Sequence, residues 1–114
     1  MITQEKSKYL FEYLEYIDSN FEKLTIKDNI SETEKILVGL ACLTEEVGEV
    51  SSEVRKMTKM SFNQKKVDSF KKEDLEDEII DVLITNLLLA KSCGISNLDE
   101  AISRKIKKNN DRGY

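Results

Sequence analysis

Acidic side chains at helical spacing are the residues of this sequence best suited to chemistry. Glu45, Glu46, Glu49 and Glu53 lie in one apolar segment, and no basic residue separates them before Arg55. On a helix, positions 46, 49 and 53 climb one side, because they are spaced by three and four residues. Like charges at this spacing repel by a few tenths of a kcal/mol per pair, so the pattern favours a bound cation.

A second pair of carboxylates stands in the most apolar part of the chain. Glu78 and Asp81 are three residues apart, and Asp81 interrupts the apolar run 79–84. A buried carboxylate without a partner costs several kcal/mol. If this pair faces Glu46 and Glu49 across a helix interface, the four side chains supply the oxygen ligands that Mg²⁺ or Mn²⁺ prefers.

Two other interpretations of the acidic residues stay open. The cluster could be a solvated face, which is the better interpretation for Glu45, Glu53, Glu73 and Asp74 taken alone. The central carboxylates could also form a structural ion pair with Lys56 or Lys105.

The composition excludes several classes of site. The sequence contains no histidine, so Ser/His or Cys/His nucleophile pairs and His zinc ligands are ruled out. Cys42 and Cys93 lack the spacing of a zinc or redox motif, which indicates a reduced, cytoplasmic protein. The net charge of −4 argues against binding to a nucleic-acid polymer. We expect no membrane segment, because no apolar run approaches the required length.

The apolar pattern predicts an all-α protein with a single domain over residues 1–114. We expect helices at about 3–24, 32–59, 72–93 and 97–109. Ser31 with Glu34 and Asn97 with Glu100 have the spacing of capping boxes, and Gly94 suits a left-handed helix end. Gly48 in the second helix would allow a ligand or another backbone to approach closely.

Apolar residues also indicate how the helices associate. The second helix carries a seam at alternating spacings of four and three, which consists of Ile36, Leu40, Leu43, Val47, Val50, Val54 and Met57. The third helix is apolar nearly all round over residues 79–90. A short chain cannot enclose such a helix alone, so we expect a homodimer or homotetramer whose chains complete a helical bundle.

These blocks resemble the MazG-like all-α nucleoside triphosphate pyrophosphohydrolases. Residues 45–49 (EEVGE) and 78–81 (EIID) look like the EExxE and ExxD signature of that family. The segment from Ala90 through Lys105, Asn109 and Arg112 is similar to its closing segment. The resemblance covers about residues 36–112.

The resemblance implies Mg²⁺-dependent cleavage of a nucleoside triphosphate into a monophosphate and pyrophosphate. Glu46, Glu49, Glu78 and Asp81 would bind the metal, and Glu45 would bind a second metal or accept the proton of the attacking water. Phosphate contacts would come from Lys105, Asn109 and Arg112. Residues 104–112 contain five basic side chains and one acid, so this tail also has a positive local field.

Several features leave the substrate undecided. The lysine-rich segment 58–72 could close over the substrate as a loop with one helical turn. Thr85 and Asn86 would face the sugar or base, or form hydrogen bonds across a helix interface. The family often stacks an aromatic ring on the base, for which the candidates here are Phe62, Phe70, Tyr9 and Tyr13, although Tyr9 and Tyr13 are better explained as core residues. The alternatives are a dUTP or phosphoribosyl-ATP pyrophosphohydrolase of the same superfamily, or a noncatalytic helical interaction module.

Overall fold

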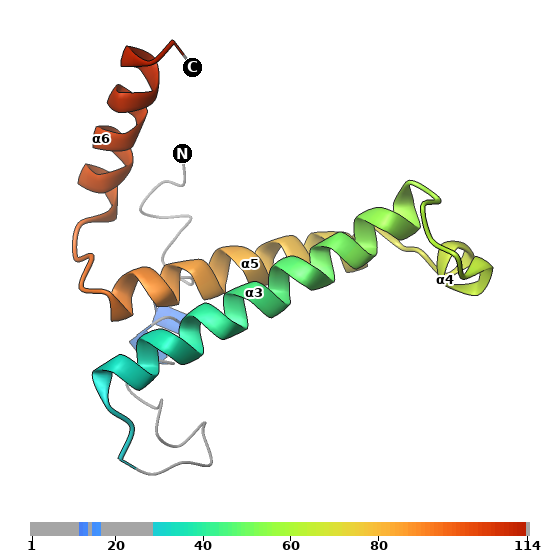
Figure 1. Cartoon of the computed structure of the whole chain (residues 1–114), viewed down its shortest axis with the longest axis horizontal. Helices are drawn as coiled ribbons and strands as arrows, with labels where there is room; N and C mark the ends of the chain where they lie inside the picture. Colours follow the sequence, from blue (N-terminus) through green and yellow to red (C-terminus); the bar gives the residue numbers. More distant parts are fainter. Residues whose placement is uncertain (1–11, 14, 17–28, 114) are drawn as a thin grey trace.

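The structure is all-α, as predicted. The computed structural model describes residues 12, 13, 15, 16 and 29–113, and within them every regular element is a helix. The elements are α3 (Glu32–Met57), α4 (Gln64–Asp68), α5 (Lys72–Ser92) and α6 (Leu98–Asp111) (Figure 1). Of the predicted helix 3–24, only residues 12, 13, 15 and 16 are described, and these are helical. The other three predicted helices agree with α3, α5 and α6 to within two residues at each end.

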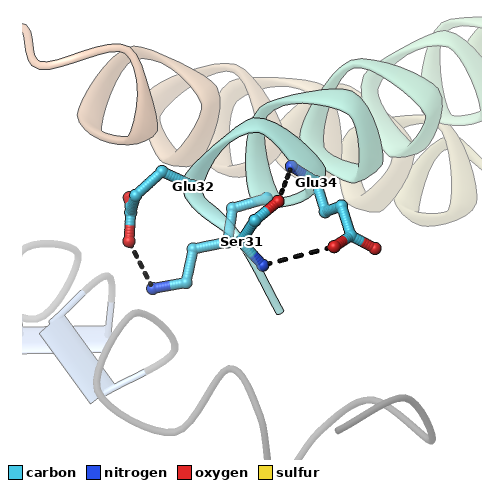
Figure 2. A network of polar contacts seen from close by, with 4 residues as sticks. Ser31, Glu32 and Glu34 are labelled. Atoms are coloured by element: carbon cyan, nitrogen blue, oxygen red, sulfur yellow. Dashed lines mark hydrogen bonds and ion pairs between the residues drawn. The ribbon is translucent and has the colours of Figure 1, made fainter. Parts of the chain in front are cut away.

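The predicted helix ends are formed by local hydrogen bonds. The Glu34 amide donates to Ser31 Oγ at 3.1 Å, and the Ser31 amide donates to Glu34 Oε1 at 3.4 Å (Figure 2). The Glu100 amide donates to Asn97 Oδ1 at 3.0 Å at the start of α6. Gly94 follows α5 with φ +83°, a conformation that glycine adopts without steric cost.

Helices α3 and α5 form an antiparallel hairpin that runs across the molecule (Figure 1). Gly39 lies against Leu89, because a Cβ atom placed there would lie 3.5 Å from Leu89 Cδ1, an ordinary contact distance. With Gly39 opposite Leu89 and equal rise along both helices, residues 46–50 of α3 lie opposite residues 78–82 of α5. At Gly48 no other backbone among the described residues makes a close approach, since none of them lies within 4 Å of a Cβ placed there. The space beside Gly48 is therefore open on this chain.

The side of α3 that contacts α5 differs from the predicted seam. Leu40, Val47 and Val54 are 51%, 49% and 37% exposed, whereas Glu46 and Glu53 are half-buried and buried. The packing face is therefore rotated part-way round the helix toward the acidic residues. Ile36, Leu43 and Val50 of the predicted seam are half-buried, so the described residues cover only part of the seam. Periodicity locates an apolar stripe without saying which element covers each part of it.

The apolar surface of α5 is also incompletely covered. Ile79 and Ile80 are about half exposed, and no described side chain is fully buried. The described part of one chain therefore does not enclose α5. None of the described helices is long and apolar enough to span a membrane.

The two ends of the hairpin carry the remaining helices. The lysine-rich segment contains α4, which contacts α3 and is capped by Asn63, whose Oδ1 accepts hydrogen bonds from the Lys65 and Lys66 amides. This confirms the predicted helical turn. At the opposite end, α6 leaves the hairpin and packs against none of α3, α4 and α5 (Figure 1).

Removing the N-cap of α3 should destabilise the hairpin. We expect Ser31→Ala to lower the free energy of unfolding by about 1 kcal/mol, because the Glu34 amide loses its acceptor. Urea denaturation followed by circular dichroism measures the change. Ser51→Ala, at an exposed position in the middle of the same helix, is the control, and an equal loss in both variants would contradict this role of Ser31.

Candidate metal centre

Three of the predicted carboxylates converge between α3 and α5. Glu46 and Glu49 of α3 and Glu78 of α5 each offer a carboxylate oxygen, and these oxygens all lie within 4.8 Å of one another. The hairpin register brings them to the same level, because Glu49 lies opposite position 79, next to Glu78, when Gly39 packs on Leu89. We call these three residues the carboxylate cluster.

The burial of the cluster suits a hard cation. Glu46 and Glu78 are half-buried, Glu49 is exposed, and one side of the group is therefore open. Glu46 Oε2 and Glu78 Oε2 are each buried without a hydrogen-bond partner. Because a buried oxygen without a donor is unfavourable, both atoms are suited to bind a divalent ion, which prefers oxygen ligands.

The close approach of the carboxyls shifts their protonation. The pKa of Glu78 is raised to about 7, first by a hydrogen bond with Glu49, then by burial and by the charges of Glu49, Asp81 and Glu46. Burial is the main cause that raises the pKa of Glu46, followed by the charge of Glu49. A hydrogen bond between two carboxyls requires one of them to carry a proton, so a cation and a proton compete for this position.

Asp81 lies beside the cluster rather than within it. The side chain is exposed, and it does not belong to the group of mutually close oxygens. Its charge nevertheless contributes to the raised pKa values of Glu46 and Glu78. The expected burial of Asp81 was wrong for a single chain, because the face of α5 against α3 carries Glu78 and Val82.

No cation of the described part of the chain neutralises the cluster. Lys56, the predicted competitor, pairs with Glu53 at 2.7 Å. No ion pair within the described residues involves Glu46, Glu49, Glu78 or Asp81; those that are found join Lys35 to Glu32, Lys56 to Glu53 and Lys91 to Glu15. The cluster therefore has an unbalanced negative charge.

Glu53 was wrongly assigned to a solvated face. It is the buried acidic residue of α3, with 9% of its surface exposed, whereas Glu45, Glu73 and Asp74 are exposed as that interpretation expected. The available signal was Lys56, three residues later, because a buried acid is tolerated when a cation pairs with it.

The predicted phosphate-binding residues lie apart from the cluster. Lys105 and Asn109 lie in the second half of α6 and Arg112 is its C-cap, and α6 does not contact the hairpin. Within the described part of one chain, the structure does not bring them to Glu46, Glu49 and Glu78.

The residues predicted to contact the nucleoside lie in different environments. The Thr85 hydroxyl donates to the Asp81 carbonyl of its own helix at 2.8 Å rather than across an interface, and Asn86 is exposed. Among the aromatic candidates, Phe62 is fully exposed and Phe70 is half-buried. Tyr13 is 47% exposed within the described residues and is no core residue there, while Tyr9 lies outside them.

Comparison with known proteins agrees with this geometry. The model of the MazG nucleotide pyrophosphohydrolase domain matches residues 34–113, a range that contains the hairpin, the carboxylate cluster and α6. The chain belongs to this family. No curated protein and no solved structure matches it. The MazG match nearly coincides with the residues from which the resemblance was inferred.

The cluster makes the stability of the metal-free protein depend on pH. The pKa of Glu78 is about 7 in the folded protein and 4.5 ordinarily, so the folded state holds this proton more tightly than the unfolded state does. The protonated carboxyl therefore stabilises the fold, and this contribution is fully present below about pH 4.5. It is lost as the pH rises through about 7. Thermal unfolding in a chelator between about pH 5 and pH 8 should show a falling Tm. Glu78→Gln should flatten this profile, and an unchanged slope in the variant would contradict the assignment.

Proposed function

We propose that this chain hydrolyses nucleoside triphosphates between the α and β phosphates, releasing a monophosphate and pyrophosphate. The observation that carries the proposal is the carboxylate cluster, which joins two helices of a MazG domain without a neutralising cation among the described residues. A noncatalytic interaction module would have no need to hold three acids so close together. A role in nucleotide-pool housekeeping and a cytoplasmic location are part of the same proposal.

Glu46, Glu49 and Glu78 would hold Mg²⁺, or Mn²⁺ in its place, with Asp81 as the fourth ligand. Their donor set fits the ion, because it consists of oxygens and includes two buried oxygens that lack hydrogen-bond partners. When bound, such an ion neutralises part of the phosphate charge and lowers the pKa of the water that it coordinates.

The protein side chains perform the other steps. Glu45 is exposed beside the cluster, where its carboxylate would accept the proton of the attacking water. Thr85 and Asn86 continue α5 one turn beyond Asp81 and would contact the nucleoside. Loss of the Glu78 proton, whose pKa is about 7, prepares the cluster for the cation near neutral pH.

The acting unit would be at least a homodimer. Leu40, Val47 and Val54 are seven residues apart and exposed, which is the pattern of a helix that packs against another helix. Ile79 and Ile80 add exposed apolar surface on α5. A second copy would cover these faces, and its α6 could bring Lys105, Asn109 and Arg112 to the phosphates.

Product analysis tests the reaction. Incubation with a panel of ribo- and deoxyribonucleoside triphosphates and Mg²⁺ should yield the monophosphate and pyrophosphate, separated by chromatography. Diphosphate with orthophosphate would contradict the position of cleavage. A chain that binds no nucleotide and whose Tm is unaffected by Mg²⁺ would instead be an interaction module, because a ligand of the folded state stabilises it.

The variant Glu49→Gln tests whether the carboxylate cluster carries out this reaction. We expect this variant to lose turnover and to bind Mg²⁺ at least about tenfold more weakly, because even outer-shell changes cost that much. Its helicity should be unchanged, since Glu49 is exposed. Full activity in the variant would remove Glu49 from the site.

The exposed stripe gives a separate prediction about assembly. Leu40→Lys should weaken self-association by about tenfold or more, because it places a charge in an apolar contact. Light scattering with size-exclusion chromatography over a concentration series measures this change. Ala41→Lys adds the same charge at the neighbouring exposed position on another side of α3 and should have a smaller effect. Equal behaviour of both variants would contradict packing through the stripe.

A further inference from the structure

We propose that Lys56, held in place by Glu53, binds the pyrophosphate end of the substrate, so that the nucleotide lies along the hairpin with its phosphates toward α4. This inference rests on the proposed function and adds to it a binding residue, a positioning residue and a direction. The phosphate contacts predicted from the sequence, Lys105, Asn109 and Arg112, lie in α6 and at its C-cap, whereas this contact comes from α3.

The pair is an ordered feature of the hairpin. Lys56 Nζ donates to Glu53 Oε1 at 2.7 Å, and the two side chains are only 21% and 12% exposed. Glu53 Oε2 is buried without a hydrogen-bond partner. A buried acid that uses one oxygen to hold an ammonium restricts that ammonium to one position, in contrast to the mobile lysines of a typical surface.

Helix geometry places Lys56 in line with the carboxylate cluster. Lys56 follows Glu49 by seven residues, which is two turns and about 10 Å along the axis. The side chains of a helix lean toward its N-terminus, so Lys56 leans toward Glu49. Both residues therefore lie on one side of α3, with Glu53 between them.

The charge of the hairpin changes sign along its length. At the level of the cluster, Glu45, Glu46, Glu49, Glu78 and Asp81 are all acidic, whereas residues 55–72 at the tip contain seven basic side chains and one acid, Asp68. The acids that begin α5, which are Glu73, Asp74, Glu76 and Asp77, lie between these two levels, so the change of sign comes at the tip itself. Asp68 accepts a hydrogen bond from Gln64 at 2.8 Å rather than from a lysine. No ion pair within the described part of the chain involves the tip lysines Lys59, Lys65, Lys66, Lys71 and Lys72.

This gradient matches the charge distribution of a bound nucleotide. A cation held by the cluster would lie at the phosphates of the cleavage point, and the terminal phosphates, the most negative end of the molecule, would extend toward the basic tip. An ammonium has three donors, so Lys56 can hold Glu53 and still donate to phosphate oxygens. The nucleoside then extends the other way, toward Thr85 and Asn86.

Binding measurements separate the two ends of the substrate. Calorimetric titrations with inorganic tripolyphosphate and with a nucleoside monophosphate, both in Mg²⁺, are compared for the wild type and Lys56→Gln. We expect tripolyphosphate to bind about tenfold or more weakly to the variant, and the monophosphate to bind equally well. Lys56→Arg should restore most of the affinity for tripolyphosphate, because it keeps the charge.

Glu53→Gln tests positioning. It should weaken tripolyphosphate binding in the wild type but have no further effect in the Lys56→Gln background, because Glu53 acts through Lys56. Lys35→Gln is the matched control, since Lys35 pairs with Glu32 in the same three-residue spacing at the opposite end of α3. It should bind both ligands as the wild type does.

The outcomes distinguish this inference from the proposed function. If the wild type binds both ligands and Lys56→Gln binds tripolyphosphate equally well, the inference is overturned while the function stands. Equal weakening of both ligands by Lys56→Gln, with a lowered Tm, would also overturn it by showing a purely structural role. If the wild type itself neither binds nor cleaves nucleotides, the proposed function fails first.

Discussion

The confinement of like charges between two packed helices is the constraint on which the rest of the structure depends. Glu46, Glu49 and Glu78 are held together where α3 packs on α5, in a register in which Gly39 lies against Leu89. Repulsion between the carboxyls opposes this packing, and a hydrogen bond with Glu49, burial and then the neighbouring charges raise the pKa of Glu78. A protein that retains such an arrangement gains stability when a cation binds, which couples its fold to its ligand.

Two kinds of acidic residue share the α3–α5 interface, and the contrast between them is informative. Glu53 is buried with its own cation, Lys56, whereas the cluster has none among the described residues. Glu53 is therefore balanced within one chain, whereas the charge of the cluster is not balanced by any cation among the described residues. The same helix thus carries an internal ion pair and, one turn away, acids of the unpaired carboxylate cluster.

The exposed apolar faces are likewise not covered by the described part of one chain. Leu40, Val47 and Val54 on α3 and the isoleucines of α5 remain exposed, and α6 contacts no other described helix. Exposed apolar area of this regularity is the pattern typical of a contact surface, as proposed above. Assembly and ligand binding would both complete a hairpin that is incomplete by itself.

The sequence by itself determined the helical class, the helix ends and the acidic positions, because capping at Ser31, periodicity and charge spacing are local properties. It could not determine which face of α3 meets α5, since a stripe of apolar residues does not identify its cover. Only the tertiary structure decided that Glu53 is buried with Lys56, that Asp81 is exposed, and that α6 lies away from the cluster. These properties depend on the register and direction of whole helices, which arise from packing between residues far apart in the chain.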